Sequence, residues 1–258
     1  MSVLSEVFEK TRAEGRAALV GYLPAGYPTV DASAELLTGM IEAGCDLVEI
    51  GVPYSDPVMD GPVIQAAATE ALSAGFRLRD VFTVVERVSA AGGTAVVMTY
   101  WNPIYRYGVE RFARDLAAAG GHGMITPDLI PDEADDWLAA SEQHGLDRIF
   151  LVAPSSTEER LASTTAASSG FVYAAAVMGV TGARDSVGAG AAGLVARTRT
   201  HTSLPIGVGL GVRSGEQAAE IAGFADAVIV GSAFVSKAAE GMAPLRTLAA
   251  ELAEGVRR

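Results

Sequence analysis

The sequence predicts an α/β fold, a (β/α)8 TIM barrel with an extra N-terminal helix, from three observations. Short apolar runs alternate with amphipathic segments along the chain, there are eight such runs, and most of them are apolar without interruption. Strand and helix in rotation predict parallel pairing, and an uninterrupted apolar run predicts a strand covered on both faces. Eight such units favour a closed barrel over an open doubly wound sheet.

The eight apolar runs are the predicted strands. They cover Ala17–Leu23, Leu47–Gly51, Ala95–Tyr100, Gly123–Thr126, Arg148–Ala153, Phe171–Ala176, Pro205–Leu210 and Ala227–Gly231. Helical spacing of apolar side chains predicts helices between them, among others over Ala32–Glu42, Val81–Ala90, Asp132–His144, Thr157–Ala167 and Gly215–Ala222. Leu4, Val7 and Phe8 share this spacing ahead of the first strand, which predicts the extra N-terminal helix.

Length and composition predict a single domain over residues 1–258. The chain has 258 residues, a usual length for one α/β barrel, and contains no linker or low-complexity segment. Its single cysteine, Cys45, cannot form an internal disulfide. The charged N-terminal segment reads neither as a signal peptide nor as a membrane span, so we expect a cytoplasmic protein without membrane contact.

The formal net charge of −12 argues against a nucleic-acid or anionic membrane surface, because both need a positive patch. Any anionic ligand must therefore be bound by local geometry. Gly209 and Gly211 precede a helix predicted from about Ser214, and Gly231 and Ser232 follow the eighth strand. Helix N-termini and glycine backbone N–H groups bind anions without lysine, and loops after strands seven and eight form the common phosphate site of this barrel.

Two predicted loops, Pro53–Gly61 and Gly179–Gly193, are longer than ordinary strand-to-helix connections. Both follow strands, so both should lie at the C-terminal end of the barrel, where such enzymes bind their substrates.

Two carboxylates flank the first of these loops. Alternation along the second strand places Leu47, Glu49 and Gly51 on one face, and the barrel interior is the better side for the acid. Partial desolvation there would raise the pKa of Glu49 and suit it to general acid/base catalysis. The alternative is a strand-end carboxylate that reaches solvent or pairs with an arginine. Asp60 precedes Gly-Pro, where its ordinary role would be a turn or helix cap.

The absence of certain residue types from suitable positions excludes several reaction mechanisms. The only lysines, Lys10 and Lys237, lie in the leading helix and beyond the eighth strand, so a Schiff-base mechanism has no obvious carrier. His122, His144 and His201 show no metal-ligand spacing, and no nucleophile-elbow motif is present. Carboxylate acid/base chemistry on a phosphorylated small molecule remains.

The chain resembles the α subunit of tryptophan synthase. The segments that carry the resemblance occur in order over nearly the whole chain: EIGVPYSDPVMDGPVIQ, MTYWNPIYRYG, TPDLIPDEA, LVAPSSTEERL, GVTGARDS, GVGLGVRSG and VGSAFV. The first segment is highly specific, whereas the phosphate loops are shared with other barrels.

The resemblance implies a lyase that cleaves indole-3-glycerol phosphate to indole and glyceraldehyde 3-phosphate, a retro-aldol reaction of tryptophan biosynthesis. It also implies a partner, the tryptophan synthase β subunit, which binds pyridoxal phosphate and receives the indole within an α2β2 heterotetramer. No cofactor is expected in this chain. Partner contacts are expected at Pro53–Gly61 and near Trp101, Asn102 and Pro103.

Residue roles carried over by the resemblance centre on the two carboxylates. Glu49 would protonate the indole ring at the carbon that bears the side chain, and Asp60 would accept the indole N–H. Tyr173 would line the site, with core packing as the alternative, and Tyr22 could stack on the indole where many relatives have phenylalanine. Thr181 would belong to a loop that closes over the substrate. The implied phosphate contacts are Gly182, Gly211, Gly231 and Ser232.

Some positions depart from the family pattern, namely Ala25–Pro28, His122, Leu210 and the pair Ala175 and Ala176, but the second strand and its loop are intact. Two alternatives stay open. One is another phosphate-binding barrel, such as a sugar-phosphate isomerase or epimerase or a neighbouring enzyme of tryptophan synthesis. The other is a mainly regulatory subunit that activates a partner.

Overall fold

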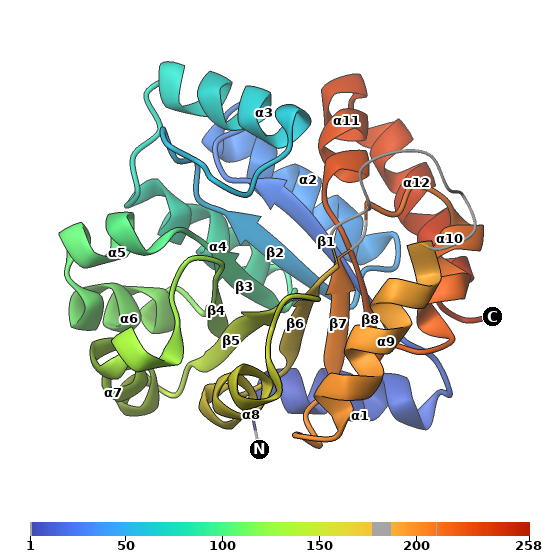
Figure 1. The fold of residues 1–258 in the computed structure, drawn as a ribbon. Coiled ribbons are helices and arrows are strands. Elements are labelled where there is room, and N and C mark those ends of the chain that lie inside the picture. Colours follow the sequence, from blue (N-terminus) through green and yellow to red (C-terminus); the bar gives the residue numbers. More distant parts are fainter. Residues whose placement is uncertain (1, 177–186, 210) are drawn as a thin grey trace.

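The computed structural model describes residues 2–176, 187–209 and 211–258 and arranges them around a closed barrel of parallel strands (Figure 1). Each strand pairs with its neighbours in the chain, and pairing of the first with the last closes the barrel. The strands are β1 (Ala18–Pro24), β2 (Leu47–Gly51), β3 (Ala95–Met98), β4 (Gly123–Thr126), β5 (Asp147–Val152), β6 (Val172–Ala175), β7 (Ile206–Gly209) and β8 (Ala227–Val230). The predicted (β/α)8 barrel is confirmed.

Helices surround the barrel, and the predicted N-terminal helix lies across the end at which the strands begin (Figure 1). The first six are α1 (Val3–Ala13), α2 (Val30–Glu42), α3 (Pro62–Ser73), α4 (Asp80–Ala90), α5 (Trp101–Tyr107) and α6 (Val109–Ala118). The 3-10 helix η1 (Pro131–Glu133) follows, then α7 (Asp135–His144), α8 (Glu158–Ala167), α9 (Val187–Arg199), α10 (Gly215–Ala222), α11 (Ser232–Glu240) and α12 (Met242–Gly255).

Polar caps fix where several helices begin. At the start of α2 the Thr29 hydroxyl accepts a hydrogen bond from the Ala32 N–H at 3.1 Å. At the start of α10 the Ser214 hydroxyl accepts from the Gln217 N–H. Each bond satisfies one of the backbone donors that the first helical turn leaves free. The caps therefore define the turns that follow β1 and β7 at the C-terminal end of the barrel.

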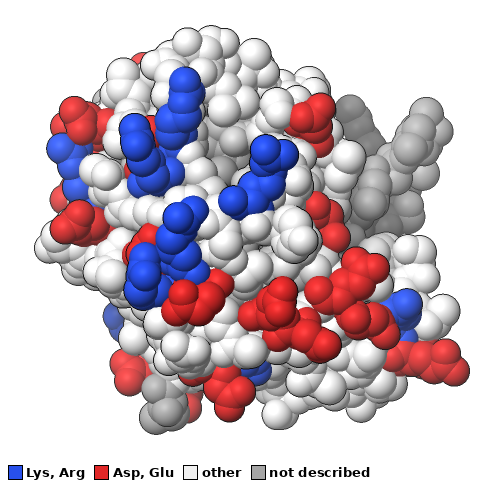
Figure 2. Space-filling view, turned by 90° about the vertical axis from the view of Figure 1, so that its left-hand side faces the viewer, with Lys and Arg blue, Asp and Glu red and all other residues white. Residues whose placement is uncertain are grey.

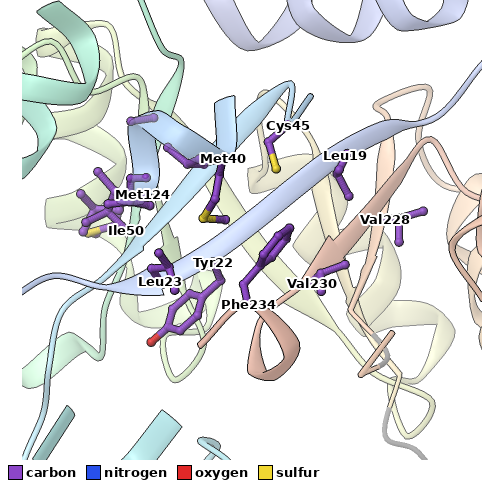
Figure 3. Close-up of a cluster of buried hydrophobic side chains, with 14 of the residues drawn as sticks. Leu19, Tyr22, Leu23, Met40, Cys45, Ile50, Met124, Val228, Val230 and Phe234 are labelled. Carbon is purple, nitrogen blue, oxygen red and sulfur yellow. The ribbon is translucent and has the colours of Figure 1, made fainter. Parts of the chain in front are cut away.

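Apolar side chains form two layers. The outer layer lies between strands and helices, and Figure 3 shows Leu23, Met40, Phe234 and their neighbours packed around β1. The inner layer fills the barrel and consists of Leu4, Phe8, Ala18, Val20, Leu47, Val96, Ile125, Ile149, Phe171, Ala227 and Ile229. Because Leu4 and Phe8 come from α1, that helix closes the N-terminal end, and the interior remains available for a site only toward the C-terminal end.

Several predicted boundaries shift by one or two residues, and three differences from the predicted elements have a clear physical reason. β3 ends at Met98, because Tyr100 already serves as the extended residue before α5. The helix predicted over Asp132–His144 is divided, because Ala134 leaves the helical conformation between η1 and α7. The loop predicted over Gly179–Gly193 is helical from Val187 onward, where α9 begins.

The glycines of α9 explain the last of these errors. Glycine lowers helix propensity, and Gly190 and Gly193 made the segment read as a loop. In the structure Ala191, Leu194 and Val195 are buried. Packing of this apolar face therefore outweighs the weak local propensity.

Candidate active site

Glu49 lies inside the barrel, as predicted. It is paired in register with Tyr22 of β1 and Val96 of β3, and only 1% of its surface is exposed. Leu47, two residues earlier on the same face, belongs to the inner apolar layer. Strand alternation therefore places the carboxyl group of Glu49 directly above that layer, toward the C-terminal end of the barrel.

The surroundings of Glu49 favour its neutral form. Among the described residues, neither of its buried carboxyl oxygens has a hydrogen-bond partner. Burial, with a smaller contribution from the nearby Asp60 charge, raises its pKa to about 8. At neutral pH the group can therefore donate a proton, and once ionised it can take one back.

Asp60 lies in the loop between β2 and α3. The residue that precedes α3 is Gly61, and no side chain caps this helix. The Asp60 carboxylate instead accepts a hydrogen bond from the Tyr100 hydroxyl at 3.1 Å. Burial raises the pKa of Asp60, whereas the Tyr100 bond acts to lower it. The cap interpretation of Asp60 is therefore wrong, because the carboxylate turns toward the barrel mouth.

A cavity of about 200 Å³ opens between these two acids and the ends of the strands. Its wall combines two carboxyl groups, two tyrosines, glycines and apolar side chains, contributed by seven of the strands, the loops that follow them and α3. The lining residues are Tyr22, Glu49, Met59, Asp60, Ile64, Met98, Leu151, Tyr173, Ala175, Ala176, Gly209, Ile229 and Gly231. Such a wall suits a small, largely apolar ligand with few polar groups.

Each of the two tyrosines lies over a glycine of the adjacent strand. A β-carbon on Gly51 would approach the Tyr22 hydroxyl oxygen to 2.3 Å, and one on Gly209 would approach that of Tyr173 to 2.5 Å. The electrostatic influence of Glu49 reaches both phenols, and burial is the main reason that their pKa values are raised. Glycine on β2 and β7 therefore makes room for the two rings that flank Glu49.

Of the four predicted phosphate residues, one lines the cavity and two follow the ends of β7 and β8 closely along the chain. Gly231 lines the cavity and Ser232 begins α11 directly after it. Gly211 follows β7 with a φ of 64°, a left-handed conformation that favours glycine. The N-termini of α10 and α11 are thus close along the chain to the cavity wall. Thr181 and Gly182 lie outside the described residues.

Tyr100 is a site residue that the sequence reasoning missed. Its position at the end of the third predicted strand was the available signal, because polar side chains there meet at the barrel mouth. Reading the strand through Tyr100 hid the turn that brings its hydroxyl to Asp60. The apolar lining residues Met98, Leu151 and Ile229 were also missed, since nothing distinguishes them from core residues in the sequence.

The described part of the chain contains no group of three or more histidine, cysteine or acidic side chains that could hold a metal ion. None of its helices is long and apolar enough to cross a membrane.

A buried carboxyl of raised pKa at the mouth of a closed barrel, beside glycine-rich turns after β7 and β8, is typical of a (β/α)8-barrel enzyme. The model of the tryptophan synthase alpha chain family matches residues 8–257, and the chain belongs to that family. The tryptophan synthase alpha chain of Nocardia farcinica is 68% identical over 256 residues, which cover 99% of this chain and 96% of the relative. That of Mycobacterium marinum is 66% identical over 257 residues, covering 100% and 96%.

Solved structures agree with this assignment. Mycobacterium tuberculosis tryptophan synthase in space group F222 contains a chain that matches with a TM-score of 0.95 and 63% identity, covering 100% of this chain and 99% of that one. The tryptophan synthase subunit alpha of Legionella pneumophila matches with a TM-score of 0.91 at 29% identity, covering 99% and 98%. The fold is thus retained where fewer than a third of the residues are identical.

Proposed function

We propose that this chain cleaves indole-3-glycerol phosphate to indole and glyceraldehyde 3-phosphate, a retro-aldol step of tryptophan biosynthesis. The observation that carries the proposal is Glu49, a carboxyl group buried inside the barrel with a pKa raised to about 8. Membership of the tryptophan synthase alpha chain family supports the choice of substrate.

Glu49 supplies and recovers the proton in this mechanism. Neutral Glu49 protonates the indole carbon that bears the side chain, which places positive charge on the ring nitrogen. The resulting carboxylate takes the proton of the neighbouring side-chain hydroxyl, and the carbon–carbon bond breaks. Its electrons return to the ring and neutralise the nitrogen, while the side chain leaves as an aldehyde. One proton is given and one taken, so a single acid/base of near-neutral pKa suffices.

Asp60 stabilises the charge that develops on the ring nitrogen. Its ionised carboxylate accepts the indole N–H, and the interaction strengthens as the nitrogen becomes positive. The rings of Tyr22 and Tyr173 flank Glu49 in the cavity and bind the indole by apolar contact. Because the protonated indole itself accepts the electrons, no Schiff base is required.

The phosphate group binds at the opposite end of the cavity. Backbone N–H groups of Gly211, Gly231 and Ser232 hold it, helped by the N-termini of α10 and α11. This arrangement binds an anion in a chain whose net charge is −12. The family resemblance assigns Gly182 to the phosphate contacts and Thr181 to a loop that covers the substrate, and both residues lie outside those that the structure describes.

A tryptophan synthase β subunit is the proposed partner, in a cytoplasmic α2β2 heterotetramer, with pyridoxal phosphate bound by the β subunit and no cofactor in this chain. Exposed apolar side chains support a docking face at the C-terminal end. Val58 of the β2–α3 loop is 78% exposed and Tyr105 of α5 is 67% exposed. Val58 lies within the predicted contact segment Pro53–Gly61, and Tyr105 lies two residues after the segment Trp101 to Pro103. Large exposed apolar side chains of this kind favour a protein interface.

Release of indole from indole-3-glycerol phosphate tests the proposal. Wild-type chain and Glu49→Gln are assayed with and without the β subunit. We expect kcat to fall by about 100- to 10,000-fold for Glu49→Gln, because the variant can neither give nor take a proton. Undiminished cleavage by Glu49→Gln would remove this residue from the mechanism. A wild-type chain that stimulates the β subunit without releasing indole would establish the regulatory alternative instead.

A further inference from the structure

Tyr100 joins the catalytic loop to the end of β3 through two hydrogen bonds. Its hydroxyl accepts the backbone N–H of Met59 at 2.9 Å and donates to the Asp60 carboxylate at 3.1 Å. Tyr100 is buried, with only 5% of its surface exposed. One buried phenol thus holds both the backbone and the side chain of consecutive residues in the β2–α3 loop.

The two bonds fix the direction of the hydroxyl hydrogen. The Met59 N–H occupies a lone pair of the phenol oxygen, so the single hydrogen of the hydroxyl is left for Asp60. A hydrogen bond from a neutral donor to an ionised carboxylate is stronger than one between neutral groups. The arrangement therefore holds Asp60 in one rotamer and favours its ionised form.

The ring of Tyr100 is itself held from the loop side. The Tyr54 ring lies against it, with 5.2 Å between ring centroids and a tilt of 33°. The Tyr54 hydroxyl accepts a hydrogen bond from the Asn102 side-chain amide at 3.0 Å. Tyr54 and Asn102 thus link the start of the β2–α3 loop to the start of α5, so the phenol of Tyr100 has little freedom to move away from Asp60.

We propose that Tyr100 is a positioning residue for the reaction, which acts through Asp60 by holding that carboxylate, ionised, at the place where the indole N–H arrives. This inference rests on the proposed retro-aldol function. It adds to that function a group that does not touch the substrate and that the sequence alone did not indicate.

The titratable groups that face Asp60 among the described residues are few. Glu49 lies across the cavity on β2, Tyr22 faces it from β1, and Tyr100 contacts it directly. Of these, only Tyr100 donates a hydrogen bond to Asp60. Removing that donor should raise the pKa of Asp60 further, because burial, which favours its neutral form, then acts without the opposing hydrogen bond.

The test compares Tyr100→Phe with wild type in the complex with the β subunit. Phenylalanine keeps the ring against Tyr54 and removes only the hydroxyl. We expect kcat/KM at pH 6 to fall by about tenfold, with most of the loss in kcat, and the acidic limb of the pH profile to move to higher pH. A fall at high pH should be smaller, since Asp60 is then ionised in both proteins.

Tyr107→Phe is the matched control. Tyr107 lies on α5 and its hydroxyl also donates to a carboxylate, that of Asp115, at 2.6 Å. This variant removes the same kind of bond outside the cavity, so kcat/KM and the pH profile should stay at wild-type values. An equal change in both variants would attribute the effect to α5 as a whole and overturn the positioning role.

A readout independent of catalysis is the carbon-13 NMR titration of the Asp60 carboxyl, assigned by comparison with Asp60→Asn. The titration of Asp60 should move to higher pH in Tyr100→Phe and stay unchanged in Tyr107→Phe. An unchanged Asp60 titration, or an active Tyr100→Phe with a wild-type pH profile, would overturn the inference alone. A wild type that releases no indole would overturn the proposed function, while the NMR result would still decide whether Tyr100 controls Asp60.

Discussion

Folding buries the carboxyl group of Glu49 and thereby disfavours its ionised form. Folding raises its pKa from 4.5 to about 8, chiefly by burial. Below pH 4.5 the group is protonated in both folded and unfolded chains, and its ionisation contributes nothing. Between pH 4.5 and 8 the unfolded chain ionises while the folded chain stays neutral, so this group makes the free energy of unfolding fall as pH rises. The loss is complete above pH 8.

Replacement of Glu49 by Gln should remove this pH dependence. Relative to wild type, Glu49→Gln should gain about 2 to 5 kcal/mol in free energy of unfolding between pH 4.5 and 8.5. Urea unfolding at both pH values measures the change, and any fixed cost of burying the amide cancels in the comparison. Glu9→Gln, at an exposed acid of α1, should show no such gain. A Glu49→Gln difference that is the same at both pH values would show that Glu49 is ionised in the folded chain.

Neighbouring strands cooperate to shape the cavity, and β1 and β2 show this most directly. Gly51 leaves the space that the Tyr22 ring occupies, and Gly231 of the β8 end lies along the other edge of that ring. Gly51→Ala would force the ring to move toward the cavity. We expect destabilisation of about 1 to 3 kcal/mol and a fall in kcat/KM of about tenfold or more, because the displaced ring enters the indole space. Thermal unfolding and the indole-release assay measure the two effects.

Gly193→Ala is the control for that substitution. Gly193 is an exposed residue of α9, and a β-carbon there would meet no atom within 4 Å. Alanine should leave activity unchanged and slightly stabilise the helix. Retention of full activity by Gly51→Ala would contradict the assignment of Tyr22 to the indole-binding wall.

The sequence carried most of the information at the level of elements. Short apolar runs identified all eight strands, and β2 and β4 have the predicted bounds. The inward placement of Glu49 followed from alternation with Leu47, because a side chain on a strand has only two faces available. Such local patterns are independent of distant contacts and could therefore be read without a structure.

The side chains around Asp60 could not be read in the same way. In the sequence alone, Asp60 resembled a helix cap. Only its hydrogen bond with Tyr100, 40 residues later in the chain, shows that its carboxylate has a different role. The packing of Tyr22 over Gly51 likewise depends on the register between β1 and β2. Contacts between separate loops and strands are set by the closed barrel and leave no periodic signal in the sequence.

At the scale of the whole molecule, charge is distributed unevenly. The chain is acidic, yet basic side chains gather on the side of the barrel shown in Figure 2, above a group of acidic ones. The left-hand side of Figure 1, which Figure 2 turns toward the viewer, includes α5 and α6, and these helices carry Arg106, Arg111 and Arg114. Arg106 directly follows the exposed Tyr105. A partner that docks at the start of α5 therefore meets basic side chains, although the chain as a whole is acidic.

The N-terminal end of the barrel is filled by apolar packing, whereas the proposed catalytic carboxyl groups lie toward its C-terminal end. Phe8 of α1 is 3% exposed and lies 5.5 Å from Phe171, ring centroid to ring centroid, in the inner layer at the N-terminal end. Phe8→Ala should lower the free energy of unfolding by about 3 to 4 kcal/mol, because it leaves a cavity where α1 closes the barrel. At temperatures where the variant stays folded, kcat/KM and its pH profile should match wild type, since Glu49 and Asp60 lie at the other end. Urea unfolding and the indole-release assay measure both quantities, and a shifted pH profile in Phe8→Ala would show that packing under the inner layer controls the catalytic carboxyl group.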